Sequence, residues 1–242
     1  MSLTIEIISK YINPTWRNLI SNVRYSGSDM FDKSRAPYWI RILSILNSNP
    51  QYHPKVDKWF NGLNLVNLSK LRVVILCQDP YPQSELANGI ALSSGTGNIT
   101  SSLRTIESEL RREYSKRSRL DYTLKRWLDE GVLMLNSAIT FNDSNNGVDH
   151  KGIGWSEFIQ AILYTVFSTR RVVLITFGSY ARNLYMEFMR NVVDKKPISW
   201  IHVVHPSPLA QMSSNPFVGS NVFKNCNMTL IRNRLVPVRW TI

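Results

Sequence analysis

The 242-residue sequence has few cysteines and no long apolar run. Its two cysteines, Cys77 and Cys226, are too few and too far apart for a disulfide framework or a CxxC zinc site, and they favour a reducing compartment. No stretch approaches the roughly 18 to 20 apolar residues of a membrane span, and the first residues lack the basic start of a signal peptide. We therefore expect a soluble, intracellular protein with no membrane partner.

Motifs for several common chemistries are also missing. No GxSxG, GxxxxGK[ST] or GxGxxG sequence occurs, which excludes the usual serine-hydrolase, nucleotide-hydrolase and dinucleotide-binding sites. The only close histidine pair is His202 and His205, whose odd separation in an extended chain sends the two side chains to opposite faces. We expect no metal and no other cofactor, with His202 as a packing residue and His53 standing alone.

Acidic residues are scarce relative to basic ones. There are 29 Lys and Arg against 17 Asp and Glu, for a formal net charge of +12. This charge favours a polyanionic partner, with nucleic acid ahead of an anionic membrane surface, although excess Lys and Arg can also serve solubility alone. The basic stretch 111–119 (RREYSKRSR) is either a DNA-binding or nuclear-localisation patch or, more often for such runs, a solvated helix end and loop.

The pattern of apolar residues predicts an α/β fold. Four short, apolar and mostly β-branched runs predict strands whose near-continuous hydrophobicity implies a sheet covered on both faces. These strands are expected at 72–77, 132–136, 172–177 and 200–204, with amphipathic helices at 102–114, 124–130, 155–168 and 180–193. Because strands and helices alternate, we expect a three-layer α/β/α arrangement around a central, mainly parallel, four-stranded sheet.

The first quarter of the chain is predicted to be helical. Asn13 can cap a helix that begins at Pro14, and further helices are expected at 38–46 and 56–63, with a loop at 25–36. No repeat, low-complexity tract or linker interrupts the sequence. We therefore expect residues 1–242 to form a single domain with a helical N-terminal segment at about 1–36.

Polar residues follow all four predicted strands. They are Gln78-Asp79-Pro80-Tyr81-Pro82, Asn136, Gly178-Ser179 and His205-Pro206-Ser207-Pro208-Leu209. In open parallel sheets, ligands bind beyond the carboxyl ends of the strands. Asp79 and His205 each precede a proline that fixes them on a stiff turn, so we favour catalysis over ordinary strand-exit turns. A carboxylate, an amide and an imidazole without a metal suggest hydrolysis at a carbon that becomes cationic.

These motifs resemble the uracil-DNA glycosylases of the uracil-N-glycosylase type, from about residue 37 to residue 240. The likeness includes the segments at 78–81, 127–136, 150–155, 178–181 and 205–209, in the order and spacing of the family. The resemblance implies the uracil-DNA-glycosylase fold and a cofactor-free, monofunctional hydrolase. Such an enzyme flips uracil out of DNA and hydrolyses its N-glycosidic bond.

The resemblance also implies a role for each motif residue. Asp79 would activate the attacking water and stabilise a cationic sugar, and neutral His205 would donate a hydrogen bond to uracil O2. Asn136 would pair with uracil N3 and O4, and Tyr81 would exclude the methyl group of thymine. The uracil-binding residues are expected to be Gln78, Tyr81, Leu92 and Asn136. The DNA-binding residues are expected to be Ser102, Gly178, Ser179, Pro206, Ser207 and the wedge Leu209.

The sequence departs from the family pattern at several positions. Cys77 replaces a glycine, Pro82 a histidine, and Thr100-Ser101 a proline pair before Ser102. Leu92 replaces the phenylalanine that stacks on uracil, at a cost on the order of 1 kcal/mol of base binding. Pro82 resembles the poxvirus branch, whose glycosylase doubles as a polymerase processivity subunit. The loop from 209 to 219 is about two residues longer than usual.

Two alternatives remain open beside an active glycosylase. Leu92 and Pro82 motivate a DNA-binding accessory subunit of a replication complex with weak or vestigial activity, and Leu92 also allows an enzyme for another damaged base. The presence of Asp79, Asn136 and His205 together favours the active enzyme. Its expected partner is single- and double-stranded DNA that contains uracil. We expect a monomer in the nucleus or in a viral replication compartment, and a replication-protein partner is left open.

Overall fold

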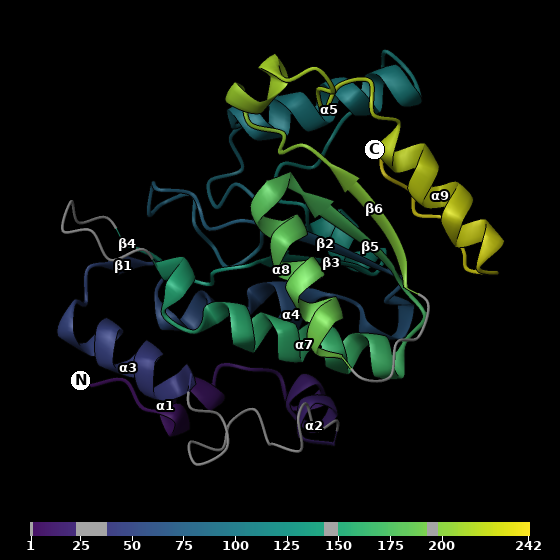
Figure 1. Cartoon of the computed structure of the whole chain (residues 1–242). Coiled ribbons are helices and arrows are strands. Elements are labelled where there is room, and N and C mark those ends of the chain that lie inside the picture. Colours follow the sequence, from purple (N-terminus) through teal and green to yellow (C-terminus); the bar gives the residue numbers. More distant parts are fainter. Residues whose placement is uncertain (1, 23–37, 143–149, 193–197) are drawn as a thin grey trace.

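The computed structural model describes residues 2–22, 38–142, 150–192 and 198–242. A four-stranded parallel sheet with strand order β3-β2-β5-β6 forms its centre (Figure 1). Its strands are β2 (Val73–Cys77), β3 (Val132–Asn136), β5 (Val173–Phe177) and β6 (Ser199–Val203). A separate antiparallel pair joins β1 (Tyr52–His53) to β4 (Phe141–Asn142). The predicted parallel sheet is confirmed.

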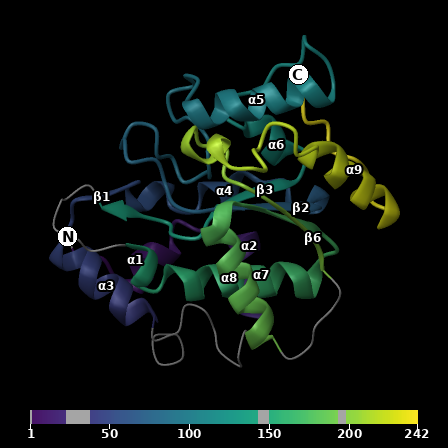
Figure 2. The same cartoon turned by 45° about the horizontal axis from the view of Figure 1, so that its top comes forward.

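Helices cover both faces of this sheet (Figure 1 and Figure 2). On one face α9 (Val222–Arg232) contacts β5 and β6, and α5 (Ser101–Glu113) contacts α9. On the other face α8 (Gly178–Asn191) contacts β2, β5 and β6, and α7 (Trp155–Thr169) contacts α8. The remaining helices are α1 (Ile5–Ser9), α2 (Pro14–Asn22), α3 (Tyr38–Ser48), α4 (Asn61–Leu65) and α6 (Lys125–Asp129). Short 3-10 turns are η1 (Val56–Lys58), η2 (Leu68–Lys70), η3 (His150–Gly152) and η4 (Leu209–Met212). The predicted three-layer α/β/α architecture is confirmed.

Burial differs between the strands of the sheet. The side chains of β2 and β5 are all buried, and in β3 only the last residue, Asn136, is half-buried. β6 is half-buried to exposed because it lies at the edge of the sheet, although α8 and α9 contact it from the two faces. His202 on β6 is exposed, and its Nδ1 lies 3.1 Å from the Thr176 hydroxyl. The prediction of His202 as a packing residue is therefore wrong.

Helices α2 and α3 begin where the sequence predicts, at Pro14 and Tyr38. Asn13 caps α2 by accepting a hydrogen bond from the Thr15 amide at 2.8 Å, and Trp16 is buried in the core. α1 was not predicted, although Thr4 caps it through the Ile7 amide. The helix expected at 56–63 is instead η1 followed by α4, and the loop expected at 25–36 lies outside the described residues. None of the helices in the described ranges is long and apolar enough to cross a membrane.

Candidate active site

The register of the sheet brings the carboxyl ends of its strands to one edge. Cys77 at the end of β2 pairs with Asn136 at the end of β3, and Phe177 at the end of β5 pairs with Val203 on β6. Because all four strands are parallel, the segments that follow them leave the sheet on the same side. The predicted site residues after the four strands therefore share this edge.

The segment that carries Asp79 is tied to the end of β3. The amide of Ser137 donates to the Cys77 carbonyl at 2.9 Å, and the amide of Ala138 donates to the Gln78 carbonyl at 3.0 Å. These bonds extend the pairing of β2 and β3 past the last strand residues. The Gln78 side chain donates to the Asp79 carboxylate at 3.2 Å, and both residues are half-buried. Asp79 and Asn136 thus project from two tips that are joined through their backbones.

Tyr81 is held from both ends. Its carbonyl accepts a hydrogen bond from His53 Nε2 at 2.9 Å, and its hydroxyl lies 3.1 Å from the Leu92 carbonyl and 2.7 Å from Thr100 Oγ1. Burial, ahead of the other influences, raises the pKa of Tyr81 to about 12, so the phenol stays protonated. His53, expected to stand alone, is instead a buried support of this loop. Nothing in the sequence near position 53 indicates this contact, because 28 residues separate the partners.

Leu92, expected to contact uracil, and Ser102, expected to contact DNA, are both buried. Leu92 is 7% exposed and adopts a left-handed backbone with φ of 61°, which is uncommon for a residue with a side chain. Ser102 is 5% exposed and lies in the first turn of α5, whose cap is Thr100. Thr100 therefore joins the start of α5 to the Tyr81 loop.

Asn136 carries a buried polar atom that lacks a partner. Its Oδ1 atom makes no hydrogen bond within the described part of the chain. An unpaired buried acceptor costs about 1–3 kcal/mol, so such groups are rare unless a ligand or water satisfies them. The side chain is half-buried at the tip of β3. A carboxamide in this state is suited to receive an N–H donor from a bound molecule.

The His205 ring is fixed in one tautomer. Its Nδ1 accepts a hydrogen bond from the Ser207 amide at 3.1 Å, so in the neutral ring the proton is on Nε2. Burial lowers the pKa of His205 from the usual 6.5 to about 4, which keeps the ring neutral at physiological pH. The imidazole therefore presents an N–H donor without a positive charge.

Gly178 lies against His205. A Cβ atom at position 178 would lie 3.1 Å from the His205 Cβ, and the backbone φ of Gly178 is +87°. Only glycine meets both conditions without strain. Helix α8 begins at Gly178 and not at residue 180 as predicted, so the amides of Gly178 and the exposed Ser179 lie in its first turn. The N-terminus of α8 is therefore next to the His205 turn.

The turn after His205 projects an apolar side chain into solvent. Pro206 is buried and Ser207 is half-buried, whereas Leu209 is 81% exposed at the start of η4. Met212, at the other end of η4, is 85% exposed and was not predicted. An exposed leucine so close to a buried turn fits the predicted wedge, because a leucine that packed into the core would be buried.

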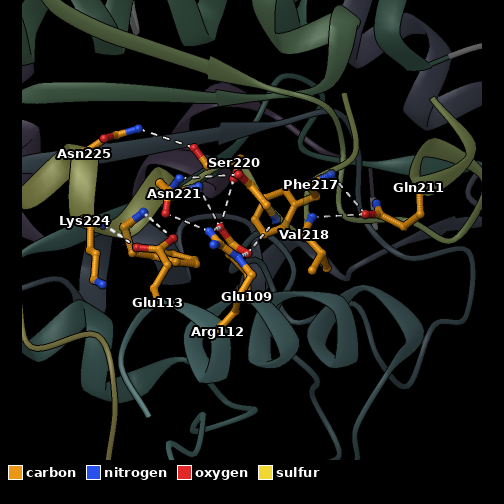
Figure 3. Close-up of polar contacts among 12 residues, drawn as sticks. Glu109, Arg112, Glu113, Gln211, Phe217, Val218, Ser220, Asn221, Lys224 and Asn225 are labelled. Carbon is orange, nitrogen blue, oxygen red and sulfur yellow. Dashed lines mark hydrogen bonds and ion pairs between the residues drawn. The ribbon is translucent and has the colours of Figure 1, made fainter. Parts of the chain in front are cut away.

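Two buried glutamates of α5 hold the chain that returns from this turn (Figure 3). Glu109 accepts hydrogen bonds from the amides of Gly219 at 2.8 Å and Asn221 at 2.7 Å, and it pairs with Arg112 at 2.8 Å. Burial alone raises the pKa of Glu109, but the bonds from Arg112 and Gly219 outweigh it and hold that pKa below its usual range. Glu113 accepts from the first amides of α9, and burial raises its pKa to about 7. These residues were missed because charged residues in a helix predict a solvated face.

The first two arginines of the basic stretch at 111–119 lie on α5 and pair with its buried glutamates. Arg111 pairs with Glu107 at 2.9 Å, and its Nε donates to the Ser118 carbonyl at 3.2 Å. Arg112 is engaged by Glu109. The interpretation as a helix end and loop therefore accounts for both arginines without a DNA contact.

A cavity of ≈ 570 Å³ lies at the opposite edge of the sheet. Its lining includes Arg170, Arg171, Val172 and Ser199, which precede or begin β5 and β6. It contains none of the predicted site residues. Across the described ranges, no group of three or more His, Cys, Asp or Glu side chains is arranged to hold a metal ion.

Comparisons with known proteins point to one family. The family model of the uracil DNA glycosylase superfamily matches residues 63–231. The chain is 29% identical to the uracil-DNA glycosylase of Campylobacter jejuni strain RM1221, over 99% of this chain and 98% of that protein. It is 30% identical to that of Azotobacter vinelandii, over 87% and 90%. The crystal structure of mimivirus uracil-DNA glycosylase has the same fold, with a TM-score of 0.77 at 22% identity, covering 99% of this chain and 90% of that one.

Proposed function

The chain belongs to the uracil-DNA glycosylase superfamily, and on this premise we propose which of its residues carry out the reaction. It is a uracil-DNA glycosylase, a hydrolase that cleaves the N-glycosidic bond between uracil and deoxyribose in DNA. The product is an abasic site, from which base excision repair proceeds. Asp79, Asn136 and His205 are proposed to act on a single extruded uracil.

Asp79 is the proposed partner of the attacking water. When the bond from C1′ of the sugar to N1 of uracil breaks, positive charge develops on the sugar and negative charge on the base. A carboxylate orients the water, takes up its proton, and stabilises the cationic sugar. The Gln78 amide that hydrogen-bonds Asp79 supports its orientation, and Gln78 is also proposed to contact uracil.

His205 is the proposed donor to the departing base. Its Nε2–H would bond uracil O2 as negative charge collects there, and preorganised donors of this kind contribute strongly to catalysis. The observation that carries the proposal is the Ser207 amide on Nδ1, because it leaves Nε2 as the protonated atom of a ring that burial keeps neutral.

Asn136 is the proposed reader of the base. Its unpaired Oδ1 would accept the N3 hydrogen of uracil while the amide nitrogen donates to O4. Cytosine presents the reverse pattern, so it would leave buried groups unpaired. Tyr81 is proposed to occupy the space beside C5 and exclude thymine, and Leu92 is proposed to cover a face of the ring. The fixed phenol of Tyr81 supports this steric role.

DNA is proposed to bind across the turns around this edge. Extruding a base from the stack costs a few kcal/mol, and the exposed Leu209 is the proposed wedge for the vacated space. Ser179 and Ser207 are proposed phosphate contacts together with the nearby amides of Gly178 and the turn at Pro206. Ser102 is buried, so the amides at the start of α5 are better placed than its hydroxyl to contact a phosphate.

The wider context of the activity is also proposed. The enzyme acts on uracil in DNA, and we propose that it accepts single and double strands as a monomeric single domain. The related glycosylases named above give no support to an accessory role with vestigial activity. We propose that it works inside the cell, where DNA is found, and the nucleus or a viral replication compartment stays a prediction.

One assay tests the proposed function. The purified chain is incubated with a single-stranded oligonucleotide that carries one uracil, and alkali then cuts the strand wherever the base has been lost. We expect complete cutting at the uracil and none in a matched thymine strand. A strand that stays intact at high enzyme concentration contradicts the function.

A further inference from the structure

The side chain of Gln211 joins both ends of the turn that carries Leu209. Its Nε2 donates to the carbonyls of His205 at 3.2 Å and Ser207 at 3.1 Å. Its Oε1 accepts from the amides of Phe217 at 3.0 Å and Val218 at 3.4 Å, as Figure 3 shows. The two donors and two acceptor positions of the carboxamide are therefore all in use.

These four contacts connect functional and buried parts of the chain. Ser207, whose carbonyl Gln211 binds, is also the residue whose amide fixes the tautomer of His205. Phe217, whose amide Gln211 binds, is fully buried, and its ring meets that of Phe177 at 5.1 Å in an edge-to-face contact. Gln211 therefore anchors the His205 turn to the core beside the end of β5.

Gln211 also lies at the base of the exposed part of the loop from 209 to 219. The chain leaves η4 at Met212 and returns to the core at Phe217. Residues 213–215 between these points are exposed. Gln211 joins the two ends of this exposed segment, so the segment does not pull the His205 turn away from the core.

We propose that Gln211 is a positioning residue that holds the His205 donor and the Leu209 wedge as one rigid unit. This inference rests on the proposed function. Gln211 need not touch uracil, because it acts through the turn that it braces. Misplacement of a catalytic group by about 1 Å can slow a reaction by about 100-fold, so such a brace affects the rate as well as the fold.

Two variants separate this role from a general contribution to stability. Gln211→Ala removes all four contacts. Gln211→Glu keeps the one oxygen that accepts from Phe217 and Val218, but at neutral pH its second carboxylate oxygen faces the carbonyls of His205 and Ser207. When that carboxylate is protonated at lower pH, its O–H can again donate to one of these carbonyls.

The experiment measures single-turnover release of uracil from single strands and from duplexes with a uracil–adenine pair. Gln51→Ala is the control, since Gln51 is an exposed glutamine outside the turn that carries His205 and Leu209. We expect Gln211→Ala to be slower by about tenfold on single strands, as for a lost net hydrogen bond, and slower still on duplexes, where the wedge is needed. Gln211→Glu should regain activity relative to wild type between pH 8 and pH 5, a range in which His205 does not titrate.

Two results would overturn the inference. One is Gln211→Ala that matches wild type on both substrates. The other is an equal loss on both substrates that follows a lowered melting temperature, with no recovery of Gln211→Glu at low pH. If wild type and Gln51→Ala release no uracil at all, the proposed function itself fails and this inference fails with it.

Discussion

Replacing His205 with alanine tests the assignment of the donor to the departing base. The variant removes the Nε2–H, and loss of one preorganised donor to a developing negative charge costs about 2.7–4 kcal/mol, or about 100- to 1000-fold in rate. Because Nδ1 binds only the Ser207 amide, no other described side chain loses a partner on this substitution. We expect the single-turnover rate on a uracil-containing single strand to fall by this factor.

Binding must be measured with the rate. The affinity for DNA with an abasic site should stay within about threefold of wild type, because phosphate contacts supply most of the affinity and His205 contacts none of the proposed phosphates. A rate that falls by less than about tenfold would refute the assigned role, and so would an equal loss of rate and affinity.

The protonation of His205 can be followed directly by NMR. Burial lowers the pKa of His205 to about 4, so the ring is neutral above that pH and becomes charged only below it. The neutral donor should therefore be present at pH 7 and pH 5 alike. As the pH falls through about 4, Nδ1 gains a proton and can no longer accept from the Ser207 amide, although Nε2–H remains a donor. Nitrogen-15 spectra should show the Nε2–H tautomer throughout the upper range. A ring that titrates near 6.5 would contradict the account.

Four further substitutions probe the rest of the site. Asp79→Asn should abolish most turnover and leave DNA binding nearly unchanged, and a parallel loss of both would argue against its role with water. Asn136→Asp should relax discrimination against cytosine, measured as base release from uracil and cytosine strands, so unchanged selectivity would argue against Asn136 as the reader. Gly178→Ala should destabilise the fold by about 1–2 kcal/mol and slow the reaction, because the added Cβ would lie against His205. An unchanged melting temperature would contradict this steric conflict. Leu209→Ala should slow uracil release from duplexes roughly tenfold more than from single strands, with no loss of stability. An equal effect on both substrates would contradict the role of Leu209 as the wedge.

The buried parts of the fold could be predicted from the sequence. The apolar runs of β2, β3 and β5 have no other stable location than between two layers of helices, and these strands are found within one residue of the predicted bounds. The run of β6 looks alike, but its edge position depends on which strands pair, and that is decided by tertiary contacts. Helix α9 was overlooked although its buried residues Val222, Phe223, Cys226 and Leu230 recur at helical spacing.

The residues after each strand could be predicted, but the residues that brace them could not. A strand tip is recognised from local sequence, and the motifs at 78–81 and 205–209 lie at the expected edge. The braces His53 and Glu109 act over 28 and 110 residues. Gln211 acts locally, yet glutamine has no strong preference for such a turn. Long-range polar contacts of this kind leave no periodic pattern, so only the structure reveals them.

The most direct test of the account is a crystal structure of the enzyme with cleaved DNA and free uracil. The account predicts one uracil ring with Asn136 at N3 and O4 and His205 Nε2 at O2, each about 3 Å away, and with Asp79 facing C1′ of the sugar. Uracil bound at the opposite edge of the sheet, beside Arg170 and Arg171, or in contact with only one of these three residues, would contradict the central claim.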